Sequence, residues 1–177
     1  MQSANPSACI GFPPSIDAHC TTLILGSMPG VTSLQQQQYY AHPHNRFWPL
    51  MACLLKQSAV PDTYEGRLSM LLCHHIALWD SIDTCERSGS LDTAIHNETG
   101  NDFSALFAQY PRLHIICFNG AKSFQSFKKY NRSLLKEKKL HFYALPSTSP
   151  ANARWRLKDL AAVWGKALND ENPEPAY

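Results

Sequence analysis

The sequence predicts a three-layer α/β/α sandwich with a central four-stranded parallel sheet. Four short runs of apolar, β-branched and aromatic residues stand out along the chain, at residues 21–25, 75–79, 114–118 and 141–145. A turn signal follows each run, which is typical of buried strands. Helical patterns lie between the runs, and this alternation favours parallel strands covered by helices on both faces.

Apolar periodicity predicts the helices in chain order. The first follows residue 45, where apolar side chains recur at helical spacing: Phe47, Leu50, Met51, Leu54 and Leu55. Residues 102–109 fit a helix before the third strand, and residues 121–130 fit the crossover helix between the third and fourth strands. The same spacing near the C-terminus predicts a last helix through Leu157, Leu160, Ala161, Trp164 and Leu168.

Composition limits the class of protein. With 177 residues, 44% of them hydrophobic, the chain is long enough for one well-buried domain but short for two. A net charge of +2 is too small to indicate nucleic-acid binding, so any surface of that kind has to be local. Six cysteines without a CxxC pair are typical of reduced thiols. We expect an intracellular monomer, cytoplasmic in a prokaryote, without cofactor, metal or membrane segment.

Both ends of the chain are predicted to be loosely held. Residues 1–20 contain prolines and few periodic apolar positions, and residues 169–177 are polar and contain prolines. We therefore expect a single domain at residues 21–168, between a loosely held N-terminal segment and a flexible tail.

The loops after the four strands are the candidate binding loops, because ligands of open parallel sheets bind beyond the carboxyl ends of the strands. These loops begin at Gly26, Asp80, Asn119 and Pro146. In the first, GSMPG, the glycines let backbone N–H groups approach a ligand. A turn without a ligand is nevertheless the more frequent outcome for so short a motif.

A dense run of aromatic, imidazole and amide groups, YYAHPHNRFW at residues 39–48, leads into the first predicted helix. Such density is unusual for a purely structural segment. The structural alternative is that Asn45 caps the helix, whose first turn contains Pro49. Spacing alone favours neither interpretation.

Three motifs together resemble the uracil-DNA glycosylase superfamily: GSMPG, YYAHPHNRFW, and LPSTSPANAR at residues 145–154. The resemblance extends from about Thr22 to Leu168 and is greatest to family 6, the hypoxanthine-DNA (deoxyinosine) glycosylases. AHPHNRFW is also similar to a segment of the mismatch-specific uracil-DNA glycosylases. The resemblance implies a DNA-repair enzyme that flips a deaminated base out of DNA and hydrolyses its N-glycosidic bond, as base excision repair requires.

The resemblance also implies roles for the first two motifs. Asn45 corresponds to the catalytic asparagine of family 6, whose amide orients the attacking water or hydrogen-bonds the reacting nucleotide. Phe47 is the expected stacking face for the base, whereas core packing explains Trp48 equally well. The mismatch-specific enzymes have a water-orienting asparagine in the first loop, where this chain has Met28. The polar groups that the first loop can offer to the base are therefore the Ser27 hydroxyl and backbone N–H groups.

Base reading is expected in the second and third loops. Asn119 can donate and accept at once, which suits the N1–H and O6 edge of hypoxanthine. Asp80 stands near the position of the base-reading asparagine of the uracil-specific family. Because an ionised carboxylate cannot donate, this difference puts uracil recognition in doubt. A structural role, in which Asp80 caps the turn through residues 81–83, explains it equally well.

The last loop is expected to grip DNA. Ser149 and Pro150 fit the N-cap and first residue of the last helix, and hydroxyl groups at a helix N-terminus also bind phosphate. Arg156 adds positive charge nearby. The residues expected to contact DNA are Gly30, His42, Ser147, Ser149, Asn152 and Arg154.

Two other functions stay open. One is a uracil- or mismatch-directed glycosylase of the same fold, and the other is a non-catalytic nucleotide- or phosphate-binding module, because a fold alone does not fix function. A serine hydrolase is disfavoured because the sequence lacks a GxSxG elbow. Nothing around Lys122 indicates Schiff-base chemistry, so the enzyme is expected to be monofunctional.

Overall fold

A computed structural model describes residues 7–169 of the chain. Its centre is a four-stranded parallel sheet in the order β3-β2-β6-β7, made of β2 (Thr22–Gly26), β3 (Ile76–Asp80), β6 (Ile115–Asn119) and β7 (His141–Leu145). Each observed strand lies within one residue of a predicted run. The predicted α/β fold with a four-stranded parallel sheet is confirmed.

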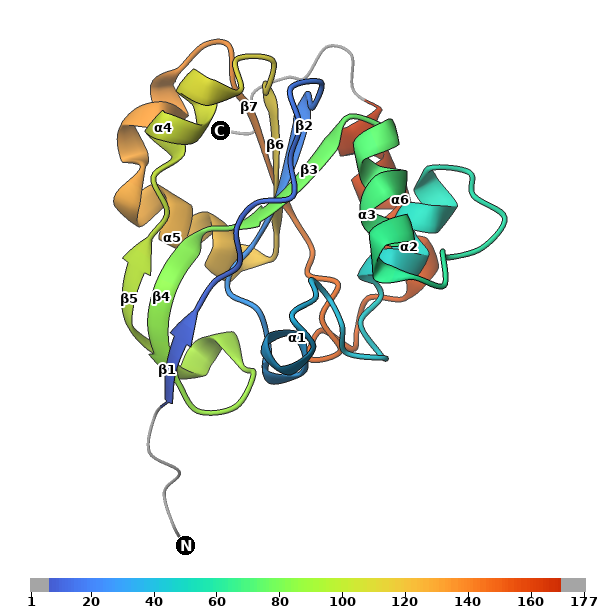
Figure 1. The fold of residues 1–177 in the computed structure, drawn as a ribbon, viewed down its shortest axis with the longest axis horizontal. Coiled ribbons are helices and arrows are strands. Elements are labelled where there is room, and N and C mark those ends of the chain that lie inside the picture. Colours follow the sequence, from blue (N-terminus) through green and yellow to red (C-terminus); the bar gives the residue numbers. More distant parts are fainter. Residues whose placement is uncertain (1–6, 170–177) are drawn as a thin grey trace, which may run out of the picture.

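Helices cover both faces of this sheet (Figure 1). One face carries α2 (Phe47–Leu54), α3 (Tyr64–Cys73) and α6 (Leu157–Leu168), and the other carries α4 (Phe103–Gln109) and α5 (Ala121–Tyr130). Side chains of β2 alternate accordingly, since Ile24 packs into the first layer while Leu23 and Leu25 pack into the second.

The helices α2, α4, α5 and α6 match the prediction, whereas the sequence does not predict α3 or the short helix α1 (Val31–Gln36). The described residues also form two 3₁₀ helices, η1 (Asp92–Ala94) and η2 (Arg132–Lys136). Within residues 7–169, no helix is long and apolar enough to span a membrane.

A second sheet, which is antiparallel and not predicted, lies beside the first. Its order is β1-β4-β5, with β1 (Ser7–Ile10), β4 (Ile82–Arg87) and β5 (Ile95–Gly100). Buried residues of β4 are separated by exposed or half-buried polar ones, so no apolar run marks this strand in the sequence. Its inner face buries a small cluster formed by Cys9, Met28, Ile82, Cys85 and Ile95.

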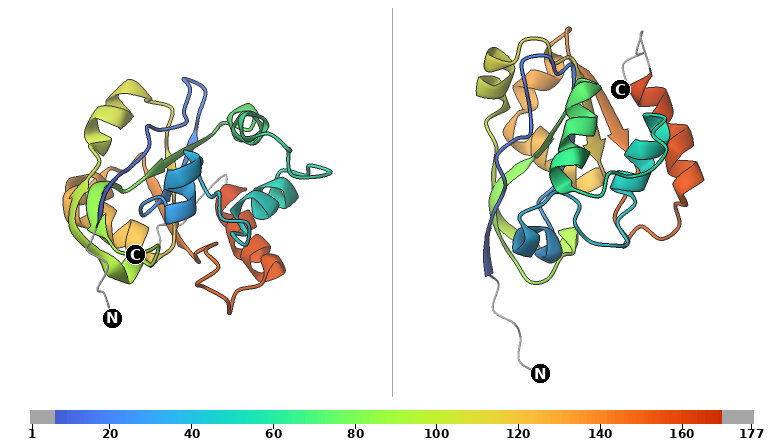
Figure 2. Two further views of the ribbon diagram at one scale, coloured as in Figure 1. Left: turned by 60° about the horizontal axis from the view of Figure 1, so that its bottom comes forward. Right: turned by 45° about the vertical axis from the view of Figure 1, so that its right-hand side comes forward.

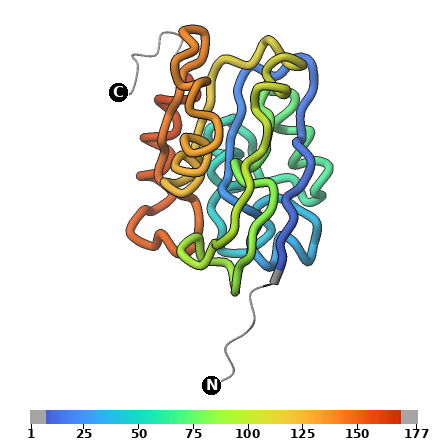
Figure 3. The backbone as a smooth tube through the Cα atoms, turned by 90° about the vertical axis from the view of Figure 1, so that its left-hand side faces the viewer, coloured from blue at the N-terminus to red at the C-terminus, as the bar shows by residue number. Residues whose placement is uncertain are grey.

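The described part of the N-terminal segment corrects the prediction that residues 1–20 are loosely held. β1 pairs with β4 (Figure 3), the Gly11 N–H donates to the Asp83 carbonyl at 2.7 Å, and Ser15 bridges to Leu78. Cys20 is fully buried. Residues 7–20 are therefore held by the antiparallel sheet and by the edge strand β3. Residues 1–6 of this segment and residues 170–177 of the expected tail lie outside the described residues.

Candidate active site

The carboxyl ends of the parallel strands open into a cavity of about 470 Å³. Its wall is formed by the loops after β2 and β7, by the last residues of β3 and β6, and by residues of α1 and of segments 39–45 and 90–93. This is the end of the molecule that comes forward in the left view of Figure 2. Most predicted site residues line this cavity: Ser27, Met28, Gly30, His42, Asn45, Asp80, Asn119, Ser147, Ser149 and Asn152. Phe47 and Arg154 do not line it.

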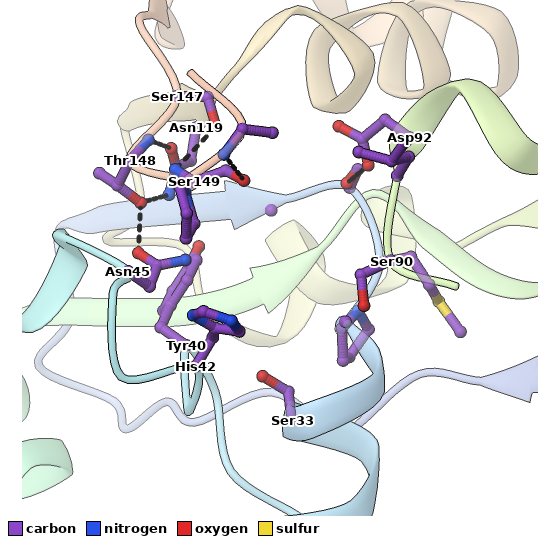
Figure 4. A pocket seen from close by; sticks show the side chains of 18 of the residues that line it. Ser33, Tyr40, His42, Asn45, Ser90, Asp92, Asn119, Ser147, Thr148 and Ser149 are labelled. Atoms are coloured by element: carbon purple, nitrogen blue, oxygen red, sulfur yellow. Dashed lines mark hydrogen bonds between the residues drawn. The ribbon is translucent and has the colours of Figure 1, made fainter. Parts of the chain in front are cut away.

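Thr148 joins two asparagines that lie far apart in the sequence (Figure 4). Its N–H donates to Asn119 Oδ1 at 2.9 Å, and Asn119 Nδ2 donates to the Thr148 hydroxyl at 3.0 Å. This hydroxyl in turn donates to Asn45 Oδ1 at 2.9 Å, which also accepts the Phe47 N–H at 3.0 Å. Because a backbone N–H can only donate, these contacts fix the orientation of both side-chain amides.

The network makes Asn45 a hydrogen-bond donor toward the cavity. Its oxygen already accepts two hydrogen bonds, whereas its Nδ2 has no hydrogen bond to any residue in the described part of the chain and points toward the cavity in Figure 4. The N-cap residue of α2 is Arg46, so Asn45 is not the N-cap that the structural alternative expected, although its oxygen satisfies the first N–H of the helix. Asn45 therefore supports the start of α2 and still offers an N–H group to a ligand.

Replacing Thr148 by valine tests the network. The change removes the central hydroxyl of a fully buried side chain, so the buried Asn119 Nδ2 loses its acceptor and Asn45 Oδ1 keeps only the Phe47 N–H. An unsatisfied buried polar group costs about 1–3 kcal/mol, and we expect the free energy of unfolding from urea titration to fall by about this amount. Thr148→Ser, which keeps the hydroxyl, is expected to lose clearly less, and equal losses would contradict the network.

Arg46 fastens the loop after β7 to the start of α2. Its backbone N–H donates to the Thr148 carbonyl at 3.1 Å. Its guanidinium donates to four carbonyl oxygens of the loop, those of Thr148, Ser149, Asn152 and Trp155. A planar fork with five N–H donors suits this task. Neither Arg46 nor Thr148 was singled out from the sequence, because both act through contacts across about 100 residues of chain.

The helix start predicted at Ser149 and Pro150 is wrong. Helix α6 begins at Leu157, and the carbonyl oxygens between it and β7 point to Arg46 instead of to a helical ladder. The Ser149 hydroxyl accepts the Ala151 N–H at 3.3 Å within a turn. The candidate phosphate site therefore belongs to a clamped loop and not to a helix N-terminus.

Other predicted DNA-contacting residues hold this loop or lie outside the cavity. The Ser147 hydroxyl accepts the Ser149 N–H at 3.1 Å, and Asn152 Nδ2 donates to the Ser147 carbonyl at 3.0 Å. Arg154 is exposed and lies outside the cavity wall. Arg156 pairs with Asp159 at the start of α6.

Tyr39 and Tyr40 are the tyrosines of the cavity wall, and the assignment of Phe47 as the stacking face is corrected. Phe47 is fully buried, on the face of α2 that also buries Leu50 and Met51. Tyr40 stacks on Phe47 with ring centroids 3.8 Å apart and an interplanar angle of 22°, and it lines the cavity. Phe47 therefore supports the cavity wall from behind.

Asp80 is a buried acid of the cavity. It ends β3 with a side chain that is 3% exposed, and within residues 7–169 its Oδ2 makes no hydrogen bond. The predicted cap of residues 81–83 is not formed. Instead, Asn101 Nδ2 donates to the Asp80 backbone carbonyl at 2.8 Å. Burial raises the pKa of the Asp80 carboxyl to about 7; Asp92 raises it further, and Arg87 lowers it.

This raised pKa predicts a pH-dependent effect of Asp80→Asn on stability. The folded wild type holds a proton between about pH 4 and pH 7 that the unfolded chain has lost, so its free energy of unfolding falls as pH rises through this window. The neutral amide has no such loss. We expect the stability difference, variant minus wild type, to increase by about 2–3 kcal/mol from pH 5 to pH 8 in urea titrations. An equal difference at both pH values would contradict a buried acid.

The first loop faces η1, which the sequence did not single out. The Ser27 hydroxyl donates to Asp92 at 2.6 Å, and Ser90 accepts the Val31 N–H at 2.9 Å. Met28 is buried and packs in the cluster beneath the antiparallel sheet. The Ser27 hydroxyl therefore already has a hydrogen-bond partner within the protein, and the Met28 side chain is part of a packed cluster.

Together, the parallel sheet, the cavity at its carboxyl edge and the oriented amides define an α/β protein with a polar cavity that contains tyrosine side chains. The sequence model of the uracil DNA glycosylase superfamily matches residues 13–168. The chain belongs to this superfamily, and the predicted family is confirmed.

Two curated relatives carry the name hypoxanthine DNA glycosylase. The protein from Methanosarcina barkeri is 39% identical over 158 residues, which are 89% of this chain and 96% of the relative. The protein from Methanosarcina acetivorans is 39% identical over 154 residues, which are 87% of this chain and 94% of the relative. A solution NMR structure from M. acetivorans, assigned to the uracil DNA glycosylases, superposes with a TM-score of 0.76 at 36% identity, covering 91% of this chain and 99% of that one.

Proposed function

We propose that this chain is a monofunctional hypoxanthine DNA glycosylase, which flips deoxyinosine out of DNA and hydrolyses its N-glycosidic bond. The two relatives of that name support this substrate, since they align with most of the chain. One observation carries the proposal: the Asn45 amide, oriented by Thr148 and Phe47, offers a donor beside the Tyr40 ring inside one cavity.

Asn45 is the proposed catalytic residue. As the bond to the sugar breaks, the departing base gains negative charge, and a preorganised N–H donor stabilises that charge more than it stabilises the bound ground state. Two hydrogen bonds within the protein already occupy the Asn45 side-chain oxygen, and this supports a role for its Nδ2 as the donor to the base. Tyr40 takes the stacking role, for which base–aromatic contact is worth about 1–3 kcal/mol.

Asn119 and Asp80 are the proposed base-reading residues. Asn119 gives one amide hydrogen and one lone pair to Thr148, so one of each is left for a base edge. Asp80 lies in the same cavity wall. A carboxyl group here, in place of an amide, favours a purine with several acceptor atoms over uracil.

The DNA strand is proposed to run across the cavity mouth. Gly30, His42, Ser147, Ser149 and Asn152 line the cavity, and Arg154, two residues after Asn152 in the chain, is exposed and positively charged. We further propose a monomeric enzyme that acts inside the cell, where its substrate is found, with residues 21–168 as its single catalytic domain.

Abasic-site formation on matched duplexes tests the function. Each duplex carries one deoxyinosine, deoxyxanthosine, deoxyuridine or undamaged deoxyadenosine, and strand cleavage by alkali reports excision. We expect the fastest reaction with deoxyinosine, unchanged in Gln57→Ala, which alters an exposed amide outside the cavity. Fastest cleavage at deoxyuridine would support a uracil- or mismatch-directed enzyme instead, and no cleavage of any duplex would support a nucleotide-binding module.

A further inference from the structure

Two buried polar groups of the cavity lack hydrogen bonds. Within residues 7–169, neither Asp80 Oδ2 nor the Tyr40 hydroxyl meets a partner at hydrogen-bonding geometry, although the Asn119 amide lies close to the hydroxyl. Both residues line the cavity. A buried polar group without a partner is costly, so a ligand that supplies the partner gains binding energy there.

Gly26 keeps the space around these groups open. A Cβ atom at this position would collide with Asp80 Oδ1 and would lie 3.3 Å from the Tyr40 hydroxyl. Gly26 ends β2 directly beside Asp80, its register partner in β3. The carboxyl, the hydroxyl and the missing side chain therefore meet at one place in the cavity wall.

The surroundings of Asp80 favour its neutral form. The charged groups that act on it are Arg87 of β4, which favours ionisation, and Asp92 of η1, which opposes it. The tyrosine hydroxyls nearby, those of Tyr39, Tyr40 and Tyr64, stay neutral because burial and the Asp80 charge raise their pKa values. Burial dominates and raises the Asp80 pKa to about 7, so a large fraction of the carboxyl carries a proton near neutral pH.

We propose that Asp80 is the general acid of the reaction and transfers its proton to a ring nitrogen of the departing purine. This inference rests on the proposed function and adds to it the origin of the proton. A neutral base is a better leaving group than an anion, and a positioned acid whose pKa matches the working pH is suited to supply the proton.

The step balances without a cofactor. The C1′–N9 bond breaks and its electron pair goes to the base, while the O–H bond of Asp80 breaks and its proton binds the base. Water adds its oxygen to C1′ and releases one proton, which restores the Asp80 carboxylic acid. The products are a neutral purine, an abasic sugar and an unchanged enzyme.

The pH dependence of excision tests this role. Single-turnover rates on a deoxyinosine duplex are measured from pH 5 to pH 9 for the wild type, Asp80→Asn and Asp92→Asn, with the exposed Asp62→Asn as control. The wild-type and Asp62→Asn rates are expected to fall as pH rises through about 7. Asp80→Asn, which cannot release a proton, is expected to lose the falling limb and about 10²-fold in rate at pH 6.

Asp92→Asn keeps the test decisive if Asp80→Asn does not fold. Removing the carboxylate that opposes ionisation lowers the Asp80 pKa, so the falling limb is expected to move to lower pH. A limb that stays in place in Asp92→Asn, or that persists in Asp80→Asn with a rate within threefold of wild type, would overturn the proposal. Either result leaves hypoxanthine excision itself intact, whereas no excision by the wild type at any pH would end the proposed function.

Discussion

Asn45→Ala is expected to slow hypoxanthine excision about 10²- to 10³-fold, the usual effect of removing one preorganised donor to a developing negative charge. DNA affinity should change little, because the proposed role of Asn45 is toward the flipped base and not toward the phosphates. Single-turnover abasic-site formation on a deoxyinosine duplex measures the rate, and fluorescence anisotropy with the same duplex measures binding. A rate within threefold of wild type would contradict the catalytic assignment.

Asn45→Asp separates the donor from the network. A carboxylate keeps the oxygen that accepts from the Phe47 N–H and from the Thr148 hydroxyl, but it replaces the N–H donor by a second acceptor. If donation is the role of Asn45, this variant is expected to lose as much rate as Asn45→Ala. Activity near the wild-type level in Asn45→Asp would mean that Asn45 acts through its oxygen, on the start of α2 and on Thr148, and not as a donor to the base.

Arg46→Met is expected to lower the rate of excision about 10²-fold, although Arg46 does not line the cavity. The change removes the donors that hold four carbonyl oxygens of the loop, including that of Thr148. With the loop free to move, Thr148 no longer holds Asn45 and Asn119 in one arrangement, and a displacement of about 1 Å can cost 10²-fold in rate. Single-turnover excision at saturating enzyme measures this loss.

Arg46→Lys is the matched control for charge. Lysine keeps the positive charge but cannot spread donors over several carbonyl oxygens as the planar guanidinium does. We expect it to restore a minor part of the rate lost in Arg46→Met. Full recovery in Arg46→Lys would mean that the charge matters and that the clamp does not.

The parallel sheet could be predicted because each of its strands is marked by local apolar residues. β2 and β6 are buried along their whole length, and continuous runs such as TLILG and IICFN have no other simple explanation. The antiparallel sheet could not be predicted in this way. β4 is buried on one face and carries polar side chains such as Asp83 and Glu86 on the other, within a segment that otherwise resembles a loop.

The candidate site was predicted where its residues follow strands, and less well where its geometry depends on distant contacts. Asp80 and Asn119 end buried strands, so their place in the cavity follows from the topology. Phe47 shares its helical spacing with Leu50 and Met51, and all three are buried. This spacing indicates core packing and was the correct guide to Phe47, whereas the motif was not. Tyr40 reaches the cavity wall from a backbone with a positive φ of 54°, which the sequence does not reveal.

We propose above all that this cavity holds a flipped hypoxanthine while its bond to the sugar is hydrolysed. The most direct test quantifies free hypoxanthine by mass spectrometry, together with abasic sites, in a single turnover on a deoxyinosine duplex. We predict equal amounts of the two products from the wild type and almost none from Asn45→Asp over the same time. Abasic sites without free hypoxanthine, or neither product from the wild type, would contradict the claim.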